Sequence, residues 1–228
     1  SFASILSSPP PCEHQCARKA DLLPEGLVTL PEALQARGYT TGALVNNINI
    51  TASYNFHQGF DTFEFLRPAY PFRASEASFR LAAYQVLRRV DERYLAATKK
   101  VERYYRPAPV VTARAIDWLR VHGQERWFLM VQYMDPHDPY FPHPADGSAY
   151  ARVENPDPDP AEAEALKALY RGEVRYWDDG FGQLMDWLEE SGLADSTAVV
   201  VTSDHGEEFA EHGASGTGPA STKSPFGF

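Results

Sequence analysis

Cysteine is scarce in this 228-residue chain, which contains only Cys12 and Cys16. Two thiolates are too few ligands for a structural zinc site, which is almost always four-coordinate. Their four-residue spacing allows a disulfide in a turn, whose Cα atoms must lie within about 7 Å, but two free thiols fit the sequence equally well. The cysteines therefore leave the redox compartment open.

Long apolar runs are absent as well. A helix that crosses a bilayer needs roughly 18 consecutive apolar residues, and no stretch of the sequence approaches that length. The sequence therefore predicts no transmembrane segment. The chain also lacks an initiator Met and a targeting segment, and it opens on Ser1-Phe-Ala-Ser4. We interpret it as an internal piece of a longer protein, in which a missing signal peptide says nothing about secretion.

Basic residues are outnumbered by acidic ones. The chain has 21 Lys and Arg against 31 Asp and Glu, which gives a formal net charge of −10. A negative field repels phosphate backbones, so the composition predicts no general nucleic-acid binding. A small anionic substrate is not excluded, because one bound metal ion can reverse the local sign of the charge. Length and composition otherwise fit one globular domain.

Helical and strand patterns alternate along the chain. Thr29-Leu-Pro-Glu32 has the residues of a capping box, and the helix that it begins should end near Gly38. Residue spacing predicts three further helices, over about 75–105, 110–121 and 161–190, and three apolar strands, over 40–45, 127–134 and 197–202. Continuous apolar strands that alternate with helices are typical of a three-layer α/β domain with a mostly parallel central sheet.

The helix predicted over 75–105 has a basic face. Its members are Arg80, Arg88, Arg89, Lys99, Lys100 and Arg103. A run of like charge usually forms a solvated helix face. The alternative is a cap that attracts acidic substrates.

Polar residues follow each of the three predicted strands where the strand ends. Asn46-Asn47 follows the first strand, Asp135 and His137 follow the second, and Asp204-His205 follows the third. In parallel α/β sheets, ligands bind outside the carboxyl ends of the strands. The sequence therefore predicts a functional site where these three groups meet.

Asp204 and His205 offer a carboxylate and an imidazole. This pair suits a divalent ion of intermediate hardness such as Zn²⁺ or Mn²⁺, and the alternative is a turn in which Asp204 accepts backbone N–H groups. His137 lies between Pro136 and Pro139, which restrict its backbone. Its imidazole could contact an oxyanion or protonate a leaving group. An idle surface histidine is the alternative.

Other residues are weaker candidates for substrate binding. Asn46-Asn47 could donate amide hydrogens to substrate oxygens, although Asn is also common in turns. His14, Arg18 and Lys19 form a small basic group that could bind an anion or could be solvated loop residues. His212 is a further imidazole, for which a surface loop is the alternative.

Four segments, in this order and spacing, resemble the sulfatases of the alkaline-phosphatase-like superfamily. They are Ser1-Phe-Ala-Ser-Ile-Leu-Ser7 with Pro11 and His14, residues 30–41 with Gly59-Phe-Asp61, the loop His137-Asp-Pro-Tyr140, and residues 192–207 with Thr202-Ser-Asp-His-Gly206. The resemblance implies the α/β fold of that superfamily, incomplete in this chain, and hydrolysis of a small sulfate ester. It implies one divalent metal ion (Ca²⁺, Mg²⁺, Mn²⁺ or Zn²⁺) with Asp204 and His205 as ligands, and His137 as a contact of the substrate anion.

The resemblance also implies how the chain is divided. We expect a partial catalytic domain over 1–213, with a helical insertion at about 70–122, and an atypical Gly-, Ser- and Pro-rich tail over 214–228. The nucleophile of the family would lie three residues before Ser1, and acidic metal ligands would also lie outside the chain. We therefore expect these 228 residues to be inactive alone. The family favours a periplasmic or extracellular location.

Two positions depart from the pattern of the family. Phe2 stands where sulfatases that convert Cys to formylglycine have Arg, and Asn46-Asn47 stands where many sulfatases have a substrate-binding Lys. These differences keep open a phosphodiesterase, a phosphonate hydrolase or a phosphoethanolamine-type transferase of the same superfamily. A catalytically inert fragment is the alternative from a different functional class.

Overall fold

A three-stranded parallel sheet organises the computed structural model, which describes residues 2–16, 18, 21–69, 78, 81–91, 99–150, 159–209 and 215–217. The strands lie in the order β2-β1-β3, and both neighbours of β1 run parallel to it. Their bounds are Thr62–Phe65 for β2, Thr40–Val45 for β1 and Trp127–Val131 for β3. The predicted parallel α/β class is confirmed, and the strands expected over 40–45 and 127–134 pair with each other. β2 is a strand that the sequence analysis did not predict.

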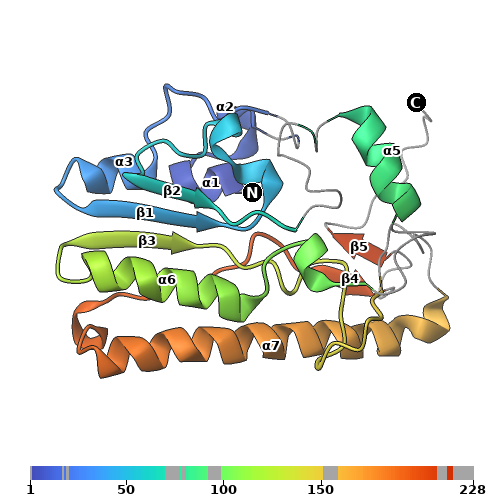
Figure 1. The fold of residues 1–228 in the computed structure, drawn as a ribbon. Coiled ribbons are helices and arrows are strands. Elements are labelled where there is room, and N and C mark those ends of the chain that lie inside the picture. Colours follow the sequence, from blue (N-terminus) through green and yellow to red (C-terminus); the bar gives the residue numbers. More distant parts are fainter. Residues whose placement is uncertain are drawn as a thin grey trace.

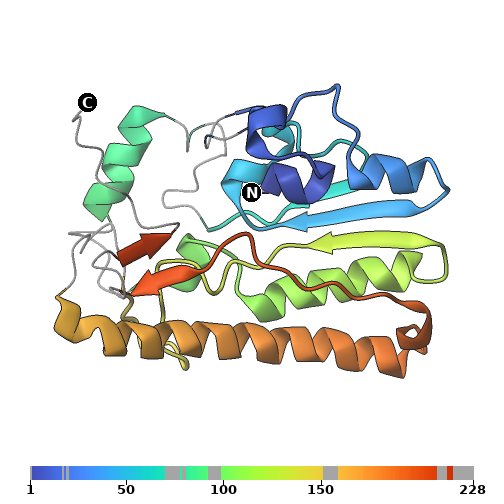
Figure 2. The same ribbon diagram turned by 180° about the vertical axis from the view of Figure 1, so that it is seen from behind.

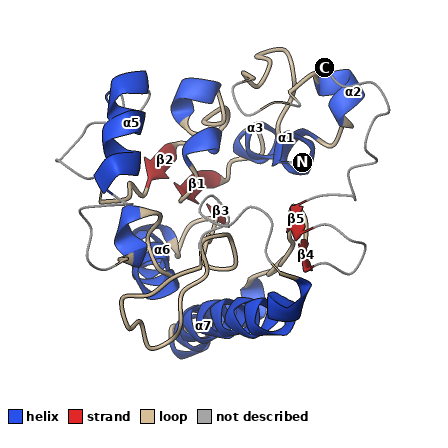
Figure 3. Ribbon diagram, turned by 90° about the vertical axis from the view of Figure 1, so that its right-hand side faces the viewer, coloured by secondary structure: helices blue, strands red, loops and turns tan. Residues whose placement is uncertain are grey.

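The central strand β1 separates two apolar cores. Ala43 and Val45 are buried against the helices on one side of the sheet, and Leu44 is buried against those on the other side. Successive strand residues point to opposite faces, so both faces of β1 are covered and its sequence is continuously apolar. Figure 3 shows these layers. One layer contains α1 (Phe2–Ser7), α2 (Pro11–His14) and α3 (Leu30–Gln35), and the other contains α6 (Ala108–His122) and α7 (Ala163–Glu190).

The start of α3 has the predicted capping box. The Thr29 side chain accepts a hydrogen bond from the N–H of Glu32, and the Glu32 carboxylate accepts one from the N–H of Thr29 at 2.7 Å. Gly38 follows the helix at φ +77°, a conformation that favours glycine. Two residues later the chain enters β1, so the local sequence sets both the helix and the start of the strand.

The helices predicted over 110–121 and 161–190 correspond to α6 and α7, which pack side by side (Figure 1). Val111, Ala115 and Leu119 bury one face of α6 between α7 and the sheet. Among the described residues, no helix has the length and the apolar sequence required to span a bilayer.

A single helix over 75–105 is a prediction that the structure corrects. The described part contains α5 (Ala82–Val90) and a separate 3₁₀ turn, η5 (Val101–Arg103), which follows an extended Lys100. Val86 and Leu87, expected on a buried face, are 59% and 56% exposed. Helical spacing alone does not supply a partner for the apolar face. Residues 70–77, 79, 80 and 92–98 lie outside the described residues, so the extent of the predicted insertion at 70–122 stays a prediction.

The third predicted strand, over 197–202, is also corrected. Val199, Val200 and Val201 are 44%, 86% and 57% exposed, and the segment forms no strand. It runs extended past α6 from η7 (Ala194–Ser196) to β4, as Figure 2 shows. No strand in the described part of the chain pairs with this segment, so its apolar side chains stay in solvent. β4 (Glu207–Phe209) instead pairs antiparallel with β5 (Ser215–Thr217), within the predicted tail.

Candidate active site

Two of the three predicted strand ends meet at one cavity of about 200 Å³. Asn46-Asn47 follows β1 and His137 follows β3, and all three residues line this cavity. The carboxyl ends of neighbouring parallel strands lie at the same edge of a sheet, so the pairing of β1 with β3 brings these residues together. We take this cavity as the candidate active site.

His137 offers an accessible ring nitrogen. Its main-chain N–H donates to the carbonyl of Met134 at 2.8 Å, which closes a turn after β3. Its Nδ1 lies 2.5 Å from the carbonyl oxygen of Asp138, and its side chain is exposed. A carbonyl oxygen can only accept, so Nδ1 carries the proton in this contact. Nε2 is then the nitrogen left to meet a ligand.

The side chains of Asn46 and Asn47 both form hydrogen bonds with main-chain groups. Asn46 is 2% exposed, and its amide donates to the carbonyl of Arg106 at 2.7 Å and accepts from the N–H of Arg106 at 2.9 Å. Asn47 accepts from the N–H of Asn49 at 2.9 Å and caps the turn η1 (Ile48–Ile50). Turn chemistry, one of the two interpretations of these residues, accounts for the contact of Asn47. Asn46 instead joins the end of β1 to a residue 60 positions later in the chain. A part for them in substrate binding stays a prediction.

Two arginines also line the cavity. Arg88 comes from α5 and Arg103 from η5, and both belong to the basic face noted in the sequence. Nη1 of Arg103 lies 2.5 Å from a carboxylate oxygen of Asp91, which holds this side chain at the cavity. A role for these two arginines in attracting an anion stays a prediction.

Asp204 and His205 lie in the extended segment after η7. Their side chains are 44% and 35% exposed, and Asp204 Oδ2 lies 3.7 Å from His205 Nε2. His205 Nδ1 donates to the carbonyl of Gly206 at 2.9 Å, and the Ser203 hydroxyl donates to the carbonyl of His205. Nε2 of His205 is therefore the ring nitrogen without a main-chain contact, and its role as a metal ligand stays a prediction.

These two donors do not complete a metal site. A divalent ion in a protein takes about four to eight ligands, depending on the metal. The described residues contain no group of three or more His, Cys, Asp or Glu side chains that could hold an ion. The donor chemistry of Asp204 and His205 suits a metal, but the coordination shell is not made by this part of the chain.

His14, in the N-terminal basic group, is buried, whereas the sequence predicted an anion contact or a solvated loop residue. His14 is 1% exposed. The N–H of Cys16 donates to its Nδ1 at 3.0 Å, so Nε2 carries the proton and donates to Ser4 Oγ at 2.9 Å. His14 thus ties α2 to α1 and is not a base for Ser4. Both cysteines are free thiols, and Lys19 and His212 lie outside the described residues.

Glu173 is a buried residue that the sequence analysis missed. It lies on α7 under the loop that carries His137, with 0% exposure. Leu166 and Gly180, seven residues before and after it, are also buried. A glutamate on the apolar stripe of a helix was the signal that could have identified it.

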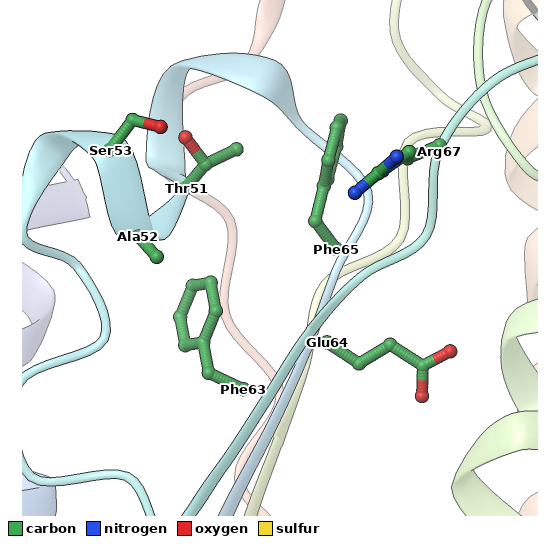
Figure 4. A pocket seen from close by; sticks show the side chains of 7 residues that line it. All are labelled: Thr51, Ala52, Ser53, Phe63, Glu64, Phe65 and Arg67. Atoms are coloured by element: carbon green, nitrogen blue, oxygen red, sulfur yellow. The ribbon is translucent and has the colours of Figure 1, made fainter. Parts of the chain in front are cut away.

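A larger depression of about 340 Å³ lies beside β2. Figure 4 shows the side chains that line it: Thr51, Ala52, Ser53, Phe63, Glu64, Phe65 and Arg67. Glu64 points away from Phe63 and Phe65, and it pairs with Arg114 at 2.7 Å. None of the predicted site residues lines this depression, so the cavity at His137 remains the candidate site.

Comparisons with known proteins identify the family of the chain. A family model described as "Sulfatase" matches residues 1–226. The multifunctional alkaline phosphatase superfamily protein PehA of Trinickia caryophylli is 26% identical over 152 residues, and the match covers 50% of this chain and 30% of PehA. A solved structure described as "Crystal structure of Ps i-CgsB" has a TM-score of 0.47 and 18% identity, covering 84% of this chain and 44% of that one. The chain thus spans less than a third of PehA and under half of the solved protein. Since the family model matches almost the whole sequence, the chain belongs to the sulfatase family.

Proposed function

We propose that the full-length protein hydrolyses a small sulfate ester at the cavity lined by His137. The observation that carries this proposal is the accessible imidazole of His137, which faces the same cavity as the guanidinium groups of Arg88 and Arg103. Membership of the sulfatase family supports the reaction class. The identity of the ester is the part that needs experiment.

The residues of the cavity supply binding and proton transfer. Arg88 and Arg103 attract the anionic group of the ester. His137, with its Nδ1–H held by the carbonyl of Asp138, presents Nε2 to the substrate. When protonated, Nε2 donates a hydrogen bond to a substrate oxygen, or its proton to the departing alcohol oxygen. A positioned imidazole contributes about 10²–10⁴-fold to such reactions.

We further propose that Asp204 and His205 are two ligands of a divalent ion. The exposed carboxylate and the available Nε2 support this assignment. The remaining ligands would lie outside the described residues. When bound, such an ion supplies Lewis-acid stabilisation of developing negative charge.

A phosphate or phosphonate ester is the second candidate substrate. Phe2 occupies the position where formylglycine-type sulfatases have Arg. Its ring packs edge-on against that of Phe56, with the ring centroids 6.2 Å apart. Phe2 is half-buried and packs against the core of the N-terminal layer. The description of PehA as an alkaline phosphatase superfamily protein is consistent with this alternative.

Hydrolysis of paired substrates by the full-length protein tests the proposal. We expect cleavage of an aryl sulfate in preference to the matching aryl phosphate and phosphonate monoester. His137→Ala should lower kcat/KM by about 100-fold, while His57→Ala, at an exposed histidine outside the cavity, should not. Preference for the phosphate ester would favour the second candidate. Full activity in His137→Ala would refute the role of the cavity, and turnover by the 228 residues alone would refute their predicted inactivity.

A further inference from the structure

One carboxyl group of α7 holds the loop that follows β3. Oε1 of Glu173 accepts the main-chain N–H of Phe141 at 2.6 Å, and its Oε2 lies 2.8 Å from Nε2 of His143. The His143 ring stacks on Tyr176, with ring centroids 3.9 Å apart. Glu173 therefore attaches two residues of the loop, four and six positions after His137, to the helix beneath.

The loop is also attached on the other side of His137. Asp135 is 0% exposed and accepts the N–H of Ala108, the first residue of α6, at 2.7 Å. The Tyr105 hydroxyl donates to the carbonyl of Asp135 at 3.3 Å and lies 3.5 Å from Oε1 of Glu173. His137 thus lies between two attachments that Tyr105 links to each other.

A buried glutamate is an unusual choice for this position. Leucine would fit the apolar stripe of α7 without desolvating a carboxyl group. Leucine could not accept the N–H of Phe141 or bond to His143. The glutamate therefore does something that the packing of α7 does not require, and its two bonds end on the loop of His137.

We propose that Glu173 is a positioning residue that, through Phe141 and His143, holds the loop carrying His137 where its imidazole contacts the substrate anion. This inference rests on the proposed role of His137. Glu173 itself touches no substrate. Misplacement of a catalytic group by about 1 Å can cost roughly 100-fold in rate, which makes such support measurable.

The protonation states of Glu173 and His143 fit the hydrogen bond between them. Burial raises the pKa of Glu173 to about 8 and lowers the pKa of His143. At neutral pH the protonated Oε2 of Glu173 donates to the neutral Nε2 of His143, and Oε1 still accepts the N–H of Phe141. Above that pH, Glu173 becomes a buried anion. The titratable groups facing it are Tyr105, Asp135 and His143, with Tyr176 on its own helix.

Two substitutions at Glu173 separate hydrogen bonding from charge. Glu173→Gln keeps an acceptor for Phe141 and a donor for His143, and it cannot ionise. Glu173→Leu removes both bonds. Glu164→Gln on the same helix is the matched control, because the Glu164 side chain is 78% exposed. Leucine at a buried polar position can prevent folding, so His143→Phe, which keeps an aromatic ring on Tyr176 and removes Nε2, is the second disruptive variant.

Hydrogen exchange of the full-length protein tests the structural half. We expect the amides of Tyr140, Phe141 and residue 143 to exchange at least tenfold faster in Glu173→Leu and His143→Phe than in the wild type, with α6 unchanged. Glu173→Gln and Glu164→Gln should match the wild type. Unchanged exchange in both disruptive variants would overturn the proposal.

Kinetics test the functional half. We expect Glu173→Leu to lose about 100-fold in kcat/KM and Glu173→Gln to stay within about threefold of the wild type at pH 7. Wild-type activity should decline above a pH of about 8, and Glu173→Gln should lack this decline, which a merely structural role would not alter. Wild-type activity in Glu173→Leu, or an identical decline in Glu173→Gln, would overturn the proposal. If the wild type hydrolysed no ester, the proposed function would fail, while exchange would still decide whether Glu173 holds the loop.

Discussion

Main-chain carbonyls and N–H groups set the tautomers of His14, His137 and His205. His137 and His205 each direct Nδ1 at a carbonyl oxygen one residue further along the chain, at 2.5 and 2.9 Å. Nε2 is therefore the available nitrogen in both. His14 has the opposite arrangement, because its Nδ1 accepts from the N–H of Cys16. Histidine thus serves as a candidate substrate contact at His137, as a candidate metal ligand at His205, and as a buried link between two helices at His14.

Substitution of Asp204 tests its proposed role as a metal ligand. Asp204→Ala removes one of the two proposed ligands, so the full-length protein should lose its stoichiometric divalent ion, which elemental analysis of the purified variant would measure. Loss of an outer-shell partner alone typically costs about 10–100-fold in metal affinity, so loss of a direct ligand should cost at least as much. Asp195→Ala, at an exposed carboxylate nine residues earlier, is the control. Retained metal in Asp204→Ala would show that the assignment is wrong.

The packing of α6 on α7 depends on the absence of a side chain at Gly180. A Cβ built there would lie 2.9 Å from Cβ of Ala108 and 3.3 Å from its carbonyl carbon. The hydroxyl of Thr112 donates to the carbonyl of Gly180 at 2.9 Å, which joins the helices at the same point. This contact also positions the start of α6, where Ala108 donates to Asp135. The loop that carries His137 is therefore supported by the close crossing of α6 and α7.

Gly180→Ala and Gly182→Ala should have effects of opposite sign. A Cβ at position 182 meets nothing within 4 Å, so alanine there should add about 0.5–1 kcal/mol through helix propensity. At position 180 the clash, typically about 1–3 kcal/mol, should exceed that gain. Urea unfolding of both variants measures the difference. Equal stabilisation by both substitutions would contradict the close crossing.

Buried acid groups give the whole molecule a pH dependence. Burial raises the pKa of Asp135 to about 6 and that of Glu173 to about 8. Both carboxyl groups bind protons more tightly in the folded than in the unfolded state. The net charge of −10 adds a repulsion that also grows as these groups ionise. Stability is therefore tied to the protonation of the residues that flank the candidate site.

The free energy of unfolding should fall as pH rises from about 6.5 to 8. In this window the folded protein retains a proton on Glu173 that the unfolded chain, with an ordinary value of 4.5, has lost. The slope is at most about 1.4 kcal/mol per pH unit for one proton. Below 6.5, the lowered pKa of His143 opposes this trend. Urea midpoints between pH 6.5 and 8 measure the slope, which Glu173→Gln should flatten. A rise in wild-type stability across this window would refute the assignment.

The sequence by itself determined the features that depend on neighbouring residues. The capping box at Thr29, the glycine after α3 and the apolar spacing of α6 and α7 are local patterns, and each was predicted close to its observed place. The meeting of polar residues at the ends of β1 and β3 could also be predicted, since parallel strands place their carboxyl ends together. Family membership followed from the order of four short segments and is confirmed by the family model.

Only the tertiary structure decided the features whose partners are far away in the chain. A strand needs a neighbour to pair with, and Val200 is exposed because the described part of the chain provides none for residues 197–202. A helix face needs a surface to cover it, and the described residues offer none to Val86, which is 59% exposed. Glu173 reaches its role through Phe141, which lies 32 residues earlier. Hydrogen-bond pairing and burial join residues that sequence distance separates, and no local pattern specifies those contacts.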